Sequence, residues 1–280
     1  GEVLEIGFSG IRAKAEAELA KLSLADGDYQ KRSRFLEAVM ISCDAAVTYA
    51  RRYAKLALEE AEKCTDPVRK MELLVIAQNC ANVPEKGANG FYEACQSFWF
   101  VQQLLQIESS GHSISPGRFD QYMNPYYQKD RTQGTITPEE AQELIDALWL
   151  KYSEWVWTIS ANTADYFAGY NQFQNLTVGG RTREGLDATN DITYMALKAT
   201  EEVKTHQPGL SVRVHADCPQ EFLAAVNNLV SKGTGFPAIH NDSVGYQMLI
   251  NAGYEPEDAR DWNNCGCVVP HYRKTGEWTA

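Results

Sequence analysis

The sequence has 280 residues, of which 44% are hydrophobic and 22% are charged, a composition typical of a globular chain that buries a large core. Its 37 acidic and 26 basic residues give a net charge of −11, with no basic stripe. Nucleic acids and anionic membranes carry charge of the same sign, so the composition argues against both as main partners. It also excludes disordered and collagen-like chains.

The sequence contains no segment suited to membrane insertion or export. It has no run of about 18 apolar residues, and its first ten residues have neither a basic start nor an apolar stretch. The seven cysteines are odd in number and four lie in helical patterns, which favours reduced thiols in the cytoplasm over a disulfide framework. Because the sequence lacks an initiator methionine and ends in a glycine-containing segment, we expect a fragment of a longer protein.

Helical periodicity dominates residues 1–168. A stripe of small and apolar residues at three- and four-residue spacing predicts one long packed helix over 35–63. An aspartate followed by a proline supplies an N-cap and a first helical residue for 66–82. Residues 91–105 continue the periodicity, and a Thr-Pro-Glu-Glu capping box opens a further helix over 137–155.

After Gly169 short strand-like runs alternate with helices of a dozen residues or more. We expect strands at 174–180, 209–215, 236–241 and 265–269. We expect helices at 187–204, 219–232 and 244–262, with Asp187 and Asp217 as N-caps of the first two. Strand and helix in repeated alternation predict an α/β fold with parallel strands joined by right-handed crossovers.

One face of the expected strands is polar. Ser211, Arg213 and His215 alternate with aliphatic residues on one strand, and His240 does so on the next. A parallel sheet covered by helices on both faces is almost continuously apolar, so a polar face indicates a lumen that holds a polar ligand. Solvent exposure at an open edge is the alternative. Their position on this polar face makes Arg213 and His240 candidate substrate contacts.

The loop Gly-His-Ser-Ile-Ser-Pro-Gly-Arg-Phe-Asp at 111–120 concentrates reactive side chains between two helices. Loops carry function more often than cores do. The structural interpretation is that Ser115 caps the next helix while Arg118 and Asp120 bond locally, and we favour it for these three residues. We favour a functional role for His112 and Ser113.

The segment Asn-Asn-Cys-Gly-Cys-Val-Val-Pro-His at 263–271 holds two thiols separated by one glycine. Zinc needs about four ligands and the other cysteines are dispersed, so we expect no metal. A thioredoxin-type redox pair has two intervening residues. A Cys267 nucleophile with His271 as its base, and an inert buried Cys267, both remain open from the residues alone.

Seven segments together resemble the glycyl radical enzymes of the pyruvate formate-lyase superfamily. They are FYEACQSFWFVQQLLQIESSGHSISPGRFDQYMNPYY (91–127), QNLTVGG (174–180), DATND (187–191), QPGLSVRV (207–214), GFPAIHND (235–242), EDARDW (257–262) and GCVVPH (266–271). The resemblance implies an α/β barrel of about ten strands wrapped in helices, which is larger than this chain. The chain would then be a partial domain: 1–168 mostly helical, and 169–280 half of the parallel barrel, ending in a cysteine loop that enters the lumen. The C-terminal glycyl radical domain would be absent.

The resemblance also implies the chemistry and the partners. An activating enzyme with S-adenosylmethionine and an iron–sulfur cluster makes a radical on a glycine outside this chain, which binds no cofactor itself. That glycine takes hydrogen from the loop cysteine, matched here by Cys267, and the thiyl radical takes hydrogen from a small-molecule substrate. His112 and Ser113 match positions that touch substrate hydroxyls in the diol dehydratases. The full-length protein is expected to form a homodimer, and the fragment alone to be inactive.

One departure from the family pattern concerns proton transfer. The eliminating branches carry glutamate as a base two residues after the cysteine, where this chain has Val269. General base catalysis contributes about 10²–10⁴ in rate, so His271 or another lumen group would have to replace it. Cys265 does not match the dehydratase pattern.

The function expected is a glycyl radical lyase that cleaves a C–C, C–O or C–N bond of a small polar metabolite. The first alternative is a formate C-acetyltransferase acting on a 2-keto acid and coenzyme A, although the adjacent cysteine pair is missing. The others are a non-catalytic barrel-type binding subunit and an ionic thiol enzyme.

Overall fold

The computed structural model describes residues 1–109, 111–155, 159–166, 172–267 and 269–271. The chain divides into two compact units, Gly1–Leu104 and Leu105–Ala280, and the division falls within one helix, α4 (Phe91–Ser109). In the part of the chain so described, no helix is both long and apolar enough to cross a membrane.

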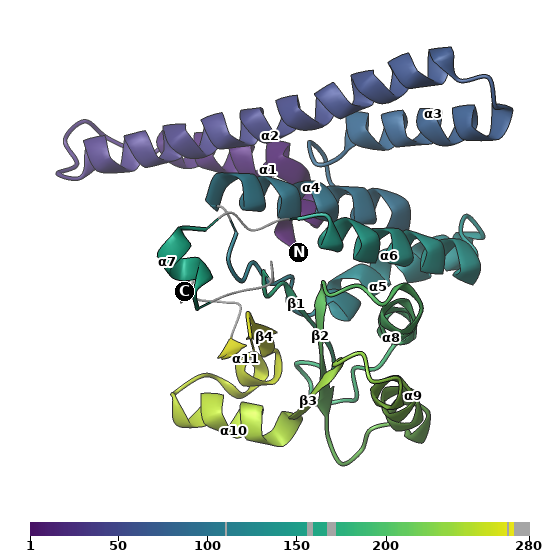
Figure 1. The fold of residues 1–280 in the computed structure, drawn as a ribbon. Helices are drawn as coiled ribbons and strands as arrows, with labels where there is room; N and C mark the ends of the chain where they lie inside the picture. Colours follow the sequence, from purple (N-terminus) through teal and green to yellow (C-terminus); the bar gives the residue numbers. More distant parts are fainter. Residues whose placement is uncertain (110, 156–158, 167–171, 268, 272–280) are drawn as a thin grey trace. The chain divides into compact units, whose positions relative to one another are not determined.

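The first unit is helical. It contains α1 (Glu2–Leu19), α2 (Tyr29–Lys63), α3 (Pro67–Asn82) and the start of α4. Alanines, one cysteine and one serine form the buried face of α2, and these small side chains allow α3 to pack closely beside it (Figure 1). The predicted N-cap of α3 is confirmed, because the carboxylate of Asp66 accepts a hydrogen bond from Val68 N at 2.9 Å.

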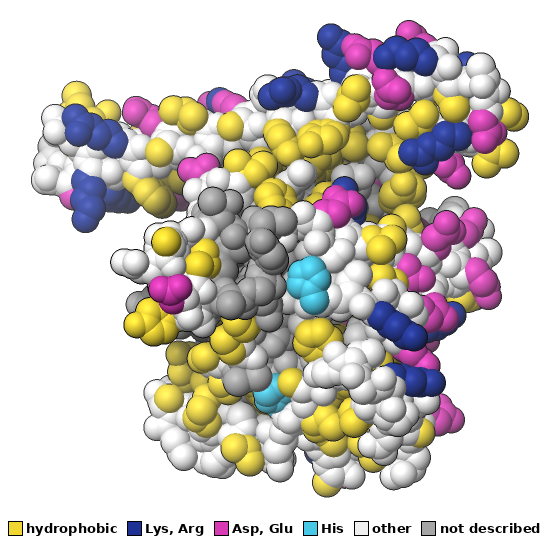
Figure 2. Space-filling model, viewed as in Figure 1, with side chains coloured by type: hydrophobic (Ala, Val, Ile, Leu, Met, Phe, Trp, Pro, Cys, Tyr) yellow, Lys and Arg dark blue, Asp and Glu magenta, His cyan; other side chains and the backbone are white. Residues whose placement is uncertain are grey.

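Large apolar side chains remain exposed on α2 and α3. Figure 2 shows hydrophobic surface over these helices, and the residues include Phe35, Ile41, Val68 and Met71. Isolated apolar side chains are common on protein surfaces, but several on neighbouring helices leave an apolar area uncovered.

The second unit begins with helices and continues as alternating strands and helices. The helices that follow α4 are α5 (Phe119–Gln133), α6 (Pro138–Ser153) and α7 (Ala161–Ala164). The capping box of α6 is confirmed: Thr137 Oγ1 accepts from Glu140 N at 3.1 Å, and Glu140 Oε2 accepts from Thr137 N at 2.8 Å.

The remaining elements, in chain order, are β1 (Asn175–Gly179), α8 (Asp191–Val203), β2 (Gly209–Val214), α9 (Gln220–Ser231), β3 (Ala238–Asn241), α10 (Asp242–Asn251), α11 (Pro256–Arg260), β4 (Asn263–Cys265) and β5 (Val269–His271).

Three strands form a parallel sheet in the order β1-β2-β3. The register pairs Leu176 with Leu210, Thr177 with Ser211, and Arg213 with His240. Side chains alternate along each strand, so the polar residues share one face of the sheet and the aliphatic residues share the other. Figure 1 shows α8 and α9 on one side of these strands and β4, α10 and α11 on the other. The predicted α/β class and the first three strands are confirmed.

The expected strand at 265–269 is wrong. The chain forms an antiparallel hairpin of β4 and β5, with Cys267 between the two strands. Gly266, at φ +58°, reverses the chain direction in a conformation that glycine adopts without steric cost.

The expected helix at 244–262 is also wrong, because it is two helices, α10 and α11. Gly253 at φ +89° ends the first, and Pro256 is the first residue of the second. The two expected N-caps are wrong as well: Asn190 caps α8 and Pro219 precedes α9. The Asn190 side chain reaches the free N–H groups of the first turn, and this leaves Asp187 to bond elsewhere.

Candidate active site

The β4–β5 hairpin carries the cysteine that the sequence analysis singled out. Cys265 pairs with Val269 across the hairpin, and Cys267 is exposed in the turn. Val269 is 58% exposed. The backbone of His271 belongs to β5, but its side chain lies outside the described residues, so its expected role as a proton handler stays a prediction.

The hairpin is bonded to strand β1 and to the loop of residues 111–117. Ser115 Oγ accepts from Gly266 N at 2.8 Å, and the side-chain amide of Asn175 donates to Gly266 O at 3.1 Å. Thr177 Oγ1, also on β1, accepts from Asn264 N at 3.0 Å. The cysteine hairpin is therefore hydrogen-bonded to the polar face of the sheet.

Ser113 lies against this hairpin. Its carbonyl oxygen is 3.6 Å from Cys265 Sγ, and its N–H donates to Gln172 O at 2.8 Å. A Cβ added to Gly266 would lie 2.7 Å from Ser113 Oγ, so the absence of a side chain there permits the close approach. The structure thus places Ser113 beside the glycine that precedes Cys267.

We expect Gly266→Ala to destabilise the protein more than Gly233→Ala. Both glycines have positive φ, +58° and +70°, and alanine in this region costs about 1–2 kcal/mol at either position. Only Gly266 adds a clash, because nothing lies within 4 Å of a Cβ built on Gly233. The measurement is the free energy of unfolding in urea. Equal losses for the two variants would show that the hairpin does not press on Ser113.

His112 is exposed at the edge of the same loop. Its ring lies 5.4 Å from that of Phe173, centroid to centroid, and desolvation lowers its pKa below the ordinary value of 6.5. The imidazole is therefore neutral at pH 7, with one nitrogen able to donate and the other able to accept a hydrogen bond. A neutral ring of this kind suits contact with a substrate hydroxyl.

Arg213 is fully buried and its described contacts are all within the chain. Its Nε and Nη2 donate to Asp242 Oδ1 at 2.7 and 2.5 Å. Nη1 donates to Trp262 O at 2.6 Å, and Nη2 to Arg260 O at 2.7 Å. Burial, with a smaller effect of the like charge on Arg118, lowers the pKa of Arg213 to about 9, so the side chain keeps its charge at neutral pH. These contacts assign Arg213 to holding the segment that leads into the hairpin, in place of the substrate contact expected from strand parity.

His240 lies next to the same segment. Its ring meets Trp262 edge to face at 6.2 Å, and burial lowers its pKa. Within the described residues its Nε2 is buried without a hydrogen-bond partner, as are Ser211 Oγ and both polar atoms of the Asn264 side chain. Asn175 Oδ1, on the same face of the sheet, is also buried without a partner. Buried polar atoms are rarely left unpaired, so these atoms of the sheet and of β4 are available to water or a small polar molecule.

The expectation that Arg118 and Asp120 bond locally is wrong, because both side chains bond to residues far away in the sequence. Arg118 Nη1 donates to Asp261 Oδ1 at 2.8 Å, and its Nη2 donates to Gly179 O at 2.9 Å. Asp120 is buried at the start of α5, and its Oδ2 accepts from Gly179 N at 2.8 Å. Burial raises the pKa of Asp120. Both side chains tie the 111–120 region to the end of β1.

Ser115 holds the cysteine hairpin by a hydrogen bond that the sequence did not indicate. It does not cap α5, whose first flanking residue is Arg118. Its contact with Gly266 crosses 151 positions of the chain, and no periodicity or short motif signals a bond of that length. The repetition of serine at 113 and 115 within the loop is the only hint that the sequence offers.

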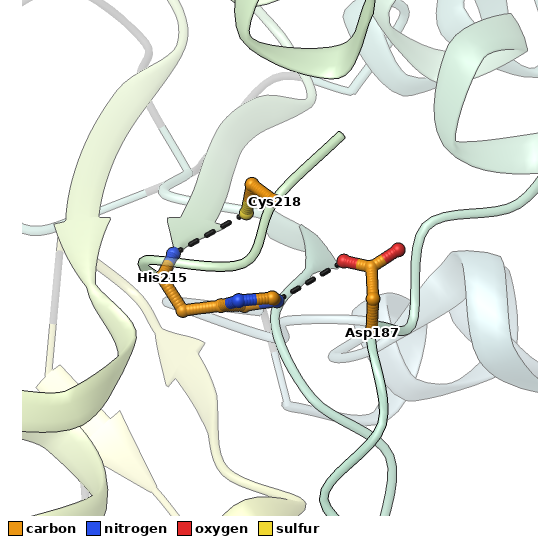
Figure 3. Close-up of side chains that lie close together, drawn as sticks. All are labelled: Asp187, His215 and Cys218. Carbon is orange, nitrogen blue, oxygen red and sulfur yellow. Dashed lines mark hydrogen bonds and ion pairs between the residues drawn. The ribbon is translucent and has the colours of Figure 1, made fainter. Parts of the chain in front are cut away.

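Among the described residues, Asp187, His215 and Cys218 form a cluster of possible metal ligands (Figure 3). His215 Nδ1 accepts from Asp217 N at 3.2 Å, so Nε2 carries the ring proton. Nε2 then donates to Asp187 Oδ1 at 3.0 Å and to Gly180 O at 3.1 Å, while Cys218 Sγ accepts from His215 N at 3.3 Å. Both ring nitrogens already make hydrogen bonds. This geometry therefore favours a structural role over metal binding, in which the cluster links the loop after β2 to the segment before α8.

A parallel sheet whose polar face is hydrogen-bonded to a cysteine hairpin defines an α/β protein with an exposed thiol beside the sheet. The family model described as "Pyruvate formate lyase-like" matches residues 1–280. The chain therefore belongs to the pyruvate formate lyase-like family, the family of the glycyl radical enzymes.

Relatives and solved structures agree with this assignment. The chain is 42% identical to an isethionate sulfite-lyase from Desulfovibrio desulfuricans, over 100% of this chain and 34% of the relative. It superimposes with a TM-score of 0.95 and 51% identity on a structure titled for 1,2-propanediol dehydration in Roseburia inulinivorans. For the glycerol-bound glycerol dehydratase of Clostridium butyricum the values are 0.93 and 48%. Each superposition covers 96% of this chain and 34% of the other. The chain thus spans about a third of the length of these relatives.

Proposed function

We propose that this chain is part of a glycyl radical lyase in which Cys267 abstracts hydrogen from a small polar metabolite. The observation that carries the proposal is the placement of Cys267 directly after Gly266. The N–H of this glycine is bonded to Ser115 of the 111–117 loop, and its C=O is bonded to Asn175 of β1. Relatives support it, since they include an isethionate sulfite-lyase, a sulfopropanediol dehydratase and a hydroxyproline dehydratase.

The enclosed site that this chemistry needs would be larger than the chain. A substrate radical has to be kept from water in a shaped cavity, whereas Cys267 is exposed among the described residues. We propose that β1, β2 and β3 belong to a barrel of about ten strands, whose other strands and glycyl radical domain close over the hairpin. The whole protein would act as a cytoplasmic homodimer.

The proposed reaction moves one hydrogen atom out and back. The glycine radical takes the hydrogen of the Cys267 S–H, which leaves glycine and a thiyl radical. The thiyl sulfur takes hydrogen from a substrate carbon, so the S–H bond re-forms and the radical passes to the substrate. In a dehydration a base then takes the proton of the hydroxyl group carried by the radical carbon. The C–O bond of the neighbouring carbon breaks, and its oxygen is protonated and leaves as water. The product radical then takes hydrogen from Cys267, and the resulting thiyl radical takes hydrogen back from the glycine, which restores the glycyl radical.

His112 and Ser113 would orient the hydroxyls of the substrate, because both lie in the loop bonded to the cysteine hairpin. Val269 has an aliphatic side chain that cannot accept a proton, so the base must be another group. We propose His271 for it. A separate activating enzyme, which uses S-adenosylmethionine and an iron–sulfur cluster, would generate the glycine radical, and this chain would bind no metal.

The test is anaerobic activation of the full-length protein, followed by electron paramagnetic resonance and a substrate screen. The screen contains 1,2-propanediol, glycerol, isethionate, (2S)-3-sulfopropanediol and trans-4-hydroxy-L-proline, the compounds in the names of the relatives given above. We expect a glycyl doublet and turnover of a small polar compound. Failure of the doublet to appear would overturn the radical mechanism, and a doublet without turnover of any polar metabolite would favour the binding subunit.

A further inference from the structure

We infer that Ser115 and Asn175 are positioning residues for the thiol of Cys267. The inference rests on the proposed function and adds two residues to the site. It begins from Gly266, whose two backbone polar groups are both bonded to side chains, the N–H to Ser115 and the C=O to Asn175.

All the hydrogen-bonding positions of the Ser115 hydroxyl are occupied. A serine hydroxyl has two acceptor positions and one proton to donate. Its oxygen accepts from Gly266 N at 2.8 Å and from Asn175 N at 3.2 Å. Its proton is directed to Ser113 O at 3.2 Å or to Phe173 O at 3.3 Å. One hydroxyl therefore joins the 111–117 loop, the start of β1 and the cysteine hairpin.

Asn175 acts on the other side of Gly266. It is 5% exposed, it is the first residue of β1, and its side-chain nitrogen donates to Gly266 O at 3.1 Å. The peptide bond is planar, so this oxygen lies in one plane with the nitrogen and Cα of Cys267. Holding the oxygen therefore sets the position of that Cα, and few torsions remain to move the sulfur.

Strand β1 holds the cysteine hairpin at a second point. Thr177 lies two residues after Asn175 on the same face of β1, and its Oγ1 accepts from Asn264 N at 3.0 Å. The hairpin is thus bonded to one strand face at two points, on either side of Cys265. This is the arrangement expected when the sheet, and not the loop itself, determines where the thiol points.

The bonds of Ser115 and Asn175 matter for geometry more than for stability. A neutral hydrogen bond contributes about 0.5–1.5 kcal/mol net to folding. Displacing a reacting group by about 1 Å can cost on the order of 100-fold in rate. Loss of either bond should therefore lower kcat by a large factor while the melting temperature falls only slightly.

The first experiment compares Ser115→Ala and Asn175→Ala with wild type in the activated full-length protein. The matched controls are Ser231→Ala and Asn251→Ala, which remove an exposed hydroxyl and an exposed amide at helix ends. We expect kcat to fall roughly 10- to 100-fold in the first pair, with unchanged glycyl radical content and little change in KM. The control pair should match wild type. Ser115→Thr, which keeps the hydroxyl, should restore most of kcat.

The second experiment needs no radical chemistry. Amide hydrogen exchange at Gly266 in the full-length protein, without activation, should be faster in Ser115→Ala than in wild type, because its acceptor is gone, and Ser115→Thr should restore protection. If wild type shows no turnover, the proposed function fails, and this exchange result alone decides whether Ser115 holds the hairpin. The inference is overturned by unchanged exchange in Ser115→Ala, or by an active wild type whose kcat neither alanine variant lowers. A loss of turnover that follows only a loss of folded protein, without rescue by threonine, also overturns it.

Discussion

Cys267→Ser is expected to abolish turnover of the activated full-length protein while its glycyl radical persists. The proposed reaction transfers a hydrogen atom through the sulfur, and a serine O–H bond is too strong for a glycine radical to break. We expect kcat to fall by at least about 10⁴-fold, which corresponds to a barrier higher by about 5.4 kcal/mol. The measurements are kcat with the substrate found in the screen, and the amplitude of the glycyl doublet.

The matched control for this experiment is Cys64→Ser. The thiol of Cys64 lies at the end of α2 and donates to Asp66 O at 3.5 Å, a bond that a serine hydroxyl can also make. This variant should keep both the doublet and turnover. Turnover by Cys267→Ser above a tenth of the wild-type rate would show that another group takes the hydrogen, and activity that survives oxygen would point to ionic thiol chemistry.

Arg213→Met is expected to destabilise the protein by about 3–5 kcal/mol, the usual cost of leaving one partner of a buried ion pair alone. The Arg213 side chain is 0% exposed and that of Asp242 3%, so water cannot replace the lost donors. The variant also removes the donors to Arg260 O and Trp262 O, at the base of the cysteine hairpin. The measurement is the free energy of unfolding in urea.

Lys198→Met is the control for Arg213→Met. Lys198 and Glu202 form an exposed pair one helical turn apart at 3.8 Å, and such pairs contribute about 0–1 kcal/mol. If Arg213→Met were as mild as this control, the buried guanidinium would not be needed to hold the segment before the hairpin, and a role toward a ligand would regain support.

Most of the secondary structure could be predicted from the sequence because its signals are local. Asp66 before Pro67, and Thr137 three residues before Glu140, place the starts of α3 and α6 within single helical turns. Alternation of polar and aliphatic residues located β2 in the same way. Predictions failed where glycine or proline interrupted a pattern, as Gly253 and Pro256 do between α10 and α11.

The sequence by itself determined the α/β class and the strands of the sheet, because residue type and short-range spacing encode both. The choice of Cys267 rests on the resemblance to the glycyl radical enzymes, since the residues alone left its role open. Only the tertiary structure decided how that cysteine is held. Ser115 meets Gly266 across 151 positions and Arg118 meets Asp261 across 143. The partners of a polar side chain depend on which segments the fold brings within about 3 Å of it, and that proximity leaves no periodic trace in the chain.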